Sequence, residues 1–182
     1  MKQTAELKKL VVGLGNRWRG EDGVGPLVLD ALRKIAHPSA GHEIDYLESP
    51  ADSLTLVNAW QNREHVYLID ACVDDTLKSG TIIRLDLTPL KPNETEDRFQ
   101  DQRPGTDDAV LKKLRHPTSS HMLDLKQALT VSQTLGAMPK HLTVYAIVIS
   151  QFDIGAPLSQ NVNDAVTTLA KQLNNQLNQA TG

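Results

Sequence analysis

The apolar residues of this chain fall into two kinds of run. In the first kind, Val, Ile and Leu follow one another without a helical repeat, as in the buried strands of a parallel sheet. The clearest example is the sequence HVYLI, which is followed directly by Asp70. Runs of this kind predict five strands, at residues 10–12, 43–47, 65–69, 81–85 and 142–149.

In the second kind of run, apolar residues recur every three or four positions, which is typical of an amphipathic helix. Runs of this kind predict helices at residues 25–36, 54–60, 121–135 and 158–177. Because strands and helices alternate, we expect an α/β fold over residues 1–182. The prediction is a single-domain three-layer sandwich, with a mostly parallel, twisted five-stranded sheet and helices on both faces.

Two segments do not follow this pattern. Residues 88–118 are polar and are broken repeatedly by proline, so they predict an irregular insertion with a short helix at 108–114. Long loops within a compact domain are often functional. The polar residues 178–182 predict a frayed C-terminal tail.

Composition narrows the class of protein. A chain of 182 residues is long enough for one domain with a proper core. Its net charge of −3 and pI near 6.0 predict no nucleic-acid partner and no binding to a membrane surface. No apolar run approaches the roughly 20 residues of a membrane span, and the single cysteine, Cys72, suits a reducing compartment. We therefore expect a cytoplasmic protein that acts as a monomer.

A glycine-rich loop connects the first strand to the first helix. Gly13 and Gly15 allow a sharp turn, and we expect at least one glycine of this loop to have backbone angles that favour glycine. The loop delivers Glu21 and Asp22 to the carboxyl end of the strand, where ligands bind in open α/β sheets. It does not complete a dinucleotide-binding fingerprint, because Trp18 occupies the position of the third glycine.

Three potential metal ligands occupy equivalent places in the predicted sheet. Asp22 follows the first strand, Asp70 terminates the third, and His121 starts the helix after the fourth. We expect all three at one edge, although a strand-terminal aspartate also caps turns. A histidine at a helix N-terminus is kept neutral by the helix dipole, and neutral imidazole binds metals. Two carboxylates and one imidazole suit nickel, zinc or manganese.

Other reactive side chains have simpler interpretations. Glu21 is either a base acting beside Asp22 or a solvated charge at the start of the helix, and we favour the solvated charge. Cys72 has no histidine near it in sequence, so we expect a buried, inert thiol. The remaining histidines lie in or beside turns or at strand starts, where we expect them to be solvated: His37, His42, His65, His116 and His141.

Three motifs appear in a fixed order along the chain. The first is GLGN at 13–16 with EDGVG at 21–25, the second is LIDA at 68–71, and the third is SSH at 119–121 with LGAMP at 135–139. In this order and placement, from about residue 9 to residue 170, the chain resembles the hydrogenase maturation endopeptidases.

The resemblance implies a function. Asp22, Asp70 and His121 match the residues that bind a metal in that family, and they are the residues implied to carry catalysis. The implied activity is removal of the C-terminal extension from the nickel-loaded large-subunit precursor of a nickel–iron hydrogenase. Nickel is implied to be recognised on the precursor, with another divalent metal as the alternative for the isolated protein. Two mechanisms stay open: water activated by a metal, or Asp22 and Asp70 acting as acid and base.

The chain departs from the family pattern at 48–51, 88–118 and 150–153, which leaves the particular substrate open. Two other functions compete. A protein with the same metal site would serve as a chaperone or checkpoint if it bound the precursor without cutting it. Peptidyl-tRNA hydrolases also begin with a strand and GLGN, but they need a histidine soon afterwards, and none lies between Asn16 and His37.

Overall fold

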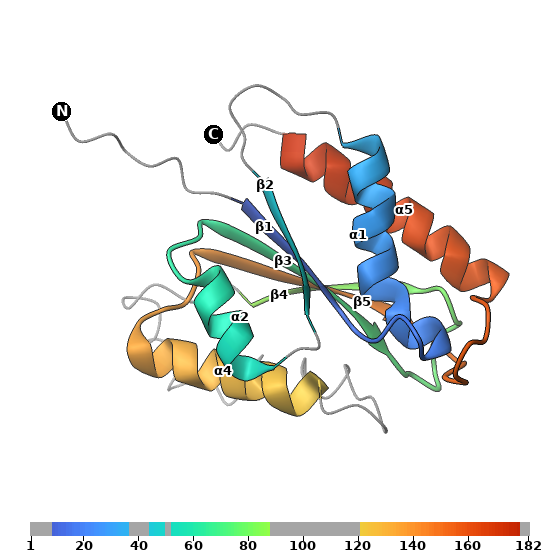
Figure 1. Cartoon of the computed structure of the whole chain (residues 1–182), viewed down its shortest axis with the longest axis horizontal. Helices are drawn as coiled ribbons and strands as arrows, with labels where there is room; N and C mark the ends of the chain where they lie inside the picture. Colours follow the sequence, from blue (N-terminus) through green and yellow to red (C-terminus); the bar gives the residue numbers. More distant parts are fainter. Residues whose placement is uncertain (1–8, 37–43, 50–51, 88–120, 179–182) are drawn as a thin grey trace.

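The computed structural model describes residues 9–36, 44–49, 52–87 and 121–178, without the side chains of 121–124. They form one sheet covered by helices on both faces (Figure 1). The strands are β1 (Lys9–Leu14), β2 (Ile44–Ser49), β3 (His65–Cys72), β4 (Ile82–Asp86) and β5 (His141–Val148). The helices are the 3-10 helix η1 (Gly20–Gly23) and the α-helices α1 (Val24–Ile35), α2 (Ser53–Trp60), α4 (His121–Leu135) and α5 (Gln160–Asn178).

The strand order is β2-β1-β3-β5-β4. β2, β1, β3 and β5 run parallel, whereas β4 pairs antiparallel with β5 at the edge. The chain passes from β1 to β2 on one side and then reaches β3 on the other side of β1. The order therefore reverses between β1 and β3, and such a reversal opens a crevice at the carboxyl ends of the two strands.

Two apolar layers hold the helices on the sheet. Successive residues of β3 show the alternation, because Leu68 packs into the layer under α2 and α4 and Ile69 into the layer under α1 and α5. Figure 1 shows the two helix pairs on opposite faces. Across the first layer, Trp60 Nε1 donates a hydrogen bond to Ser132 Oγ at 2.8 Å, which satisfies the one polar atom of a completely buried ring.

Glycines allow α1 to lie directly on β1 and β3. A Cβ atom added to Gly13 would lie 2.6 Å from Gly25 O, and one added to Gly25 would meet Leu14 and, at 2.7 Å, Ile69 O. Side chains are excluded here because backbone contacts backbone. Gly15 has φ +122°, which confirms the expected glycine conformation in this loop.

The predicted α/β sandwich is confirmed, with small differences at element ends. β3 is the main exception, because it continues to Cys72 instead of stopping before Asp70. Residues 88–118, with the helix expected at 108–114, lie outside the described residues. Asn178 still belongs to α5, and the rest of the expected tail also lies outside them. None of the helices in the described ranges is long and apolar enough to cross a membrane.

Candidate active site

Asp22 lies at the switch point between β1 and β3. It belongs to η1, which follows the β1 loop and contacts β3. The side chain is 3% exposed, and the Asn16 backbone N–H donates to Asp22 Oδ2 at 3.2 Å. The conformation of Gly15 brings its Cα against the Asp22 carbonyl, so a side chain at residue 15 would collide with the loop that carries the carboxylate.

Asp70 lies on β3, one residue past the last β1–β3 pair, Gly13 with Ile69. The expectation that it terminates the strand is wrong, because β3 continues beside β5 as far as the pair Cys72–Val148. Asp70 nevertheless lies just beyond the end of the β1–β3 pairing. Its side chain is 9% exposed and Oδ1 accepts a hydrogen bond from the Ala71 N–H at 2.8 Å. Asp22 and Asp70 therefore lie on contacting elements beside the same crevice.

His121 is the first residue of α4, as expected from the sequence. The helix leads back to the start of β5, so it begins on the side of the sheet to which the parallel strands point. Among the described side chains, no group of three or more His, Cys, Asp or Glu residues is arranged to hold a metal ion. The imidazole of His121 is not one of those side chains, so the three-ligand site stays a prediction.

Glu21 differs from its expected role as a solvated charge. It is completely buried and joins two loops that are 130 residues apart in sequence. Oε2 accepts from the N–H groups of Ser150 at 2.8 Å and Gln151 at 3.0 Å. Oε1 accepts from Ser159, from the N–H at 3.0 Å and from Oγ at 2.5 Å. Burial opposes ionisation, but these hydrogen bonds outweigh it and hold the pKa of Glu21 below its ordinary value.

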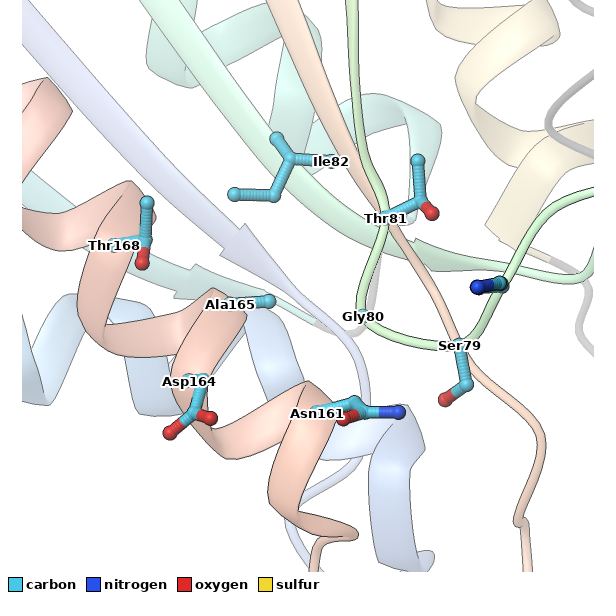
Figure 2. A pocket seen from close by; sticks show the side chains of 9 residues that line it. Ser79, Gly80, Thr81, Ile82, Asn161, Asp164, Ala165 and Thr168 are labelled. Carbon is cyan, nitrogen blue, oxygen red and sulfur yellow. The ribbon is translucent and has the colours of Figure 1, made fainter.

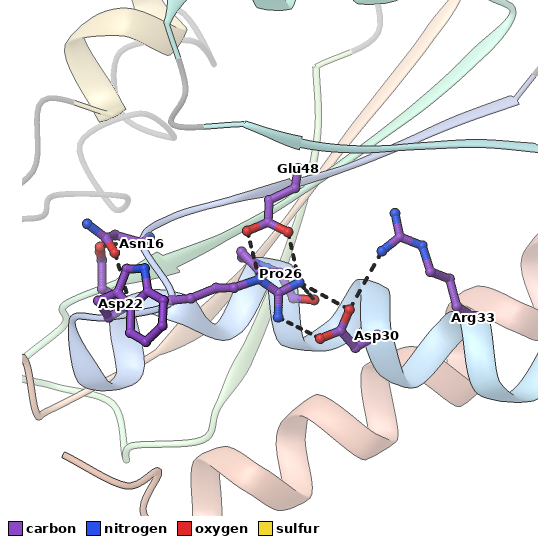
Figure 3. A network of polar contacts seen from close by, with 8 residues as sticks. Asn16, Asp22, Pro26, Asp30, Arg33 and Glu48 are labelled. Atoms are coloured by element: carbon purple, nitrogen blue, oxygen red, sulfur yellow. Dashed lines mark hydrogen bonds and ion pairs between the residues drawn. The ribbon is translucent and has the colours of Figure 1, made fainter. Parts of the chain in front are cut away.

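Arg17 lies in the same loop as Glu21 and binds that loop to β2 and α1. Its guanidinium binds Glu48 of β2 through two nitrogens, at 2.7 and 2.8 Å, and Asp30 of α1 at 2.6 and 3.1 Å (Figure 3). The pKa values of Glu48 and Asp30 are lowered, chiefly by these hydrogen bonds. The sequence does not indicate this cluster, because its three residues are separated along the chain and share no motif. Glu48 lies in one of the segments that depart from the family pattern.

Cys72 is buried, as expected. Burial, with the charges of Asp70 and Asp74, raises the pKa of its thiol to about 12, so the thiol is protonated at neutral pH. Two of the histidines expected to be solvated are described. His141 is exposed, but His65 is only half-exposed and its ring stacks on that of His141, with 4.5 Å between the ring centroids. Both lie at the amino ends of their strands, away from the crevice.

A pocket of about 430 Å³ lies between the start of β4 and α5 (Figure 2). Asp164, Ala165 and Thr168 of α5 form one wall, and the chain leading into β4 forms the other. Neither Asp22 nor Asp70 lines it, so this pocket is separate from the candidate site.

Comparison with known proteins agrees with the architecture. A family model described as hydrogenase maturation protease matches residues 103–176, which is less than half of the chain. The hydrogenase maturating endopeptidase HybD of Escherichia coli is 21% identical, with a TM-score of 0.69 over 91% of this chain and 89% of that one. The HybD hydrogenase maturation protease of Thermococcus kodakarensis is 22% identical, with a TM-score of 0.58 over 93% and 99%.

A third structure, the hydrogenase 2 maturation peptidase of a Thaumarchaeota archaeon, is 18% identical, with a TM-score of 0.59 over 94% of this chain and 98% of that one. No curated protein sequence matches. At these identities the structures establish the fold. Together with the family match, they confirm the resemblance to the hydrogenase maturation proteases, which are peptidases.

Proposed function

We propose that this protein is an endopeptidase of hydrogenase maturation, which removes the C-terminal extension of a nickel–iron hydrogenase large-subunit precursor. The observation that supports it most directly is the placement of Asp22 and Asp70 on contacting elements beside one crevice. The fold around them is that of structures named as maturation endopeptidases. In this proposal the nickel is carried by the precursor and is part of the substrate.

Peptide hydrolysis requires a base that takes a proton from water and an acid that protonates the leaving amine. A pair of carboxyl groups supplies both, and Asp22 and Asp70 are our candidates for these two roles. The backbone N–H groups of Asn16 and Ala71 orient one oxygen of each carboxylate. If a divalent ion is resident, Asp22, Asp70 and His121 would hold it, and its chemistry is Lewis-acid polarisation of the scissile carbonyl.

The test measures cleavage of nickel-loaded precursor by its shift on a gel. The melting temperature of each variant is measured alongside. We expect Asp22→Asn, Asp70→Asn and His121→Ala each to abolish cleavage and to weaken binding of divalent metal. Their melting temperatures should stay close to wild type, and in the two Asp→Asn variants loss of carboxylate repulsion offsets the lost hydrogen bonds.

The control is Leu68→Ala, in the core beneath the site. We expect it to cost ~2–5 kcal/mol of stability and to leave the folded fraction active. Processing by His121→Ala at the wild-type rate would refute the three-residue site. Tight binding of precursor by the wild-type protein without any cleavage would instead identify a chaperone or checkpoint protein.

A further inference from the structure

Two loops at the carboxyl edge of the sheet form one rigid unit. The first runs from residue 15 to residue 23, and the second runs from residue 149 to residue 159. Besides the four hydrogen bonds to the Glu21 carboxylate, the Glu21 N–H donates to Gln151 O at 3.2 Å. Gly20, with φ +55°, lies so close to the second loop that a Cβ atom would be 2.9 Å from Asp153 O.

This unit carries the two most exposed large apolar side chains among the described residues. Trp18 is 78% exposed and Ile154 is 83% exposed. Their backbones are joined, because the Gly155 N–H donates to Trp18 O at 3.1 Å. We call Trp18 and Ile154 the apolar platform. Large apolar side chains that a rigid backbone holds in solvent are characteristic of contact surfaces.

The platform is continuous with the candidate active site. The Trp18 N–H donates to Asn16 Oδ1 at 2.9 Å, and the Asn16 N–H donates to Asp22 Oδ2 at 3.2 Å. The charge of Arg17, which lies between these two residues, is turned toward Glu48 and Asp30. Beside the carboxylate the loop therefore offers apolar contact at Trp18, while the charge of Arg17 is held by Glu48 and Asp30.

We infer that the apolar platform docks an apolar segment of the precursor polypeptide next to its scissile bond. The inference rests on the proposed function, because Trp18 lies on the same loop as Asp22 and is joined to it through Asn16. The platform is built before the substrate arrives, since Glu21 fixes both loops in the free protein. Preorganised aromatic contacts of this kind contribute affinity at a small cost in conformational entropy.

The test compares Trp18→Ala and Ile154→Ala with Leu135→Ala. Leu135 is 68% exposed but lies at the last residue of α4, near the amino edge, so it controls for loss of any exposed apolar side chain. We expect the platform variants to raise the KM for precursor about tenfold and to change kcat little, because they remove binding without touching the carboxylates. The dissociation constant of precursor, measured with each substitution in an Asp70→Asn background, should rise in parallel.

Melting temperatures close to wild type should accompany these effects, since the platform side chains are exposed. An unchanged KM and dissociation constant in both platform variants, with wild-type protein cutting the precursor, would overturn the docking surface alone. Wild-type protein that neither binds nor cuts precursor would overturn the proposed function and the docking surface with it. A wild-type dimer that Trp18→Ala converts to a monomer would assign the platform to a second copy of this chain instead.

Discussion

The two ends of the same sheet handle their polar groups differently. At the carboxyl end, Glu21 and Asp22 are buried, and their hydrogen-bond donors are backbone N–H groups together with the Ser159 hydroxyl. At the amino end, Lys9 is also buried and donates to Leu177 O at 2.8 Å, but the ion pairs are made by exposed or half-exposed side chains. Lys140 and Glu64 form an ion pair at 3.3 Å, and Arg63 pairs with Asp45.

The difference shows which polar contacts matter for the stability of the fold. Exposed ion pairs contribute little, because water already solvates both partners. A buried carboxylate is costly unless every oxygen has donors, so a fold keeps one where its position matters. At the amino end, the rings of His65 and His141 stack on each other, and burial there lowers the pKa of His65. We therefore expect loss of the Glu21 carboxylate at the carboxyl end to lower the unfolding free energy more than loss of the Glu64 carboxylate at the amino end.

The strongest test of this contrast is Glu21→Ala compared with Glu64→Ala. Removing the Glu21 carboxylate leaves three N–H groups without their acceptor, and we expect a loss of about 2–4 kcal/mol of unfolding free energy. Cleavage should fall as well, because both loops beside Asp22 lose their common anchor. Glu64→Ala should cost less than about 0.5 kcal/mol.

Acid unfolding provides a second readout of the same substitution. The pKa of Glu21 is lower in the folded than in the unfolded chain, so its stabilisation is present above the ordinary value of 4.5 and is lost as pH falls through the folded value. Glu21→Gln should therefore flatten the fall in stability below about pH 4.5. Equal acid profiles for Glu21→Gln and wild type would show that the buried carboxylate does not stabilise the fold.

Sequence patterns predicted the sheet better than they predicted this anchor. The apolar runs located every described strand, most clearly β1, β3 and β5, which are buried on both faces. The alternation of strands and helices predicted that Asp22 lies at the carboxyl end of the first strand, but it did not predict the strand order that makes this position a switch point. The role of Glu21 did not, because its partners Ser150 and Ser159 lie in a loop about 130 residues away. A serine directly before α5 is a common helix-start signal, but it does not indicate which carboxylate it binds.

Asp70 shows a second limit of sequence patterns. An apolar strand followed by aspartate predicts that the strand stops there, yet β3 continues because β5 offers further partners as far as Val148. The end of a strand depends on its neighbour, which a local pattern does not contain.

The next largest loss of stability is expected for substitution of Gly13, where α1 lies against β1. Gly13→Ala places a Cβ atom against Gly25 O at 2.6 Å and Leu29 Cδ1 at 2.9 Å, and backbone must move to admit it. We expect a loss of about 2–3 kcal/mol, as for an overpacked core, with reduced cleavage because α1 shifts relative to β1. The matched variant Gly136→Ala lies after α4, where φ is +63° and no atom lies within 4 Å of the new Cβ.

For Gly136→Ala only the left-handed backbone conformation is disfavoured, so we expect a loss of about 1 kcal/mol and normal cleavage. Chemical denaturation of both variants measures the difference. A larger loss for Gly136→Ala would mean that backbone conformation, and not the close approach of α1 to β1, limits stability at these glycines.

Cleavage is expected to be unaffected by substitution of Cys72, although this residue lies at the carboxyl end with Asp70. Its thiol is buried and its pKa is about 12, so almost no thiolate is present at neutral pH and the group is a poor nucleophile. Cys72→Ala should cleave precursor like wild type and lose about 1 kcal/mol of stability. The native protein should resist a thiol-modifying reagent and react with it only after unfolding. Loss of cleavage in Cys72→Ala at an unchanged melting temperature would assign the reaction to a thiol and contradict the pair of carboxylates.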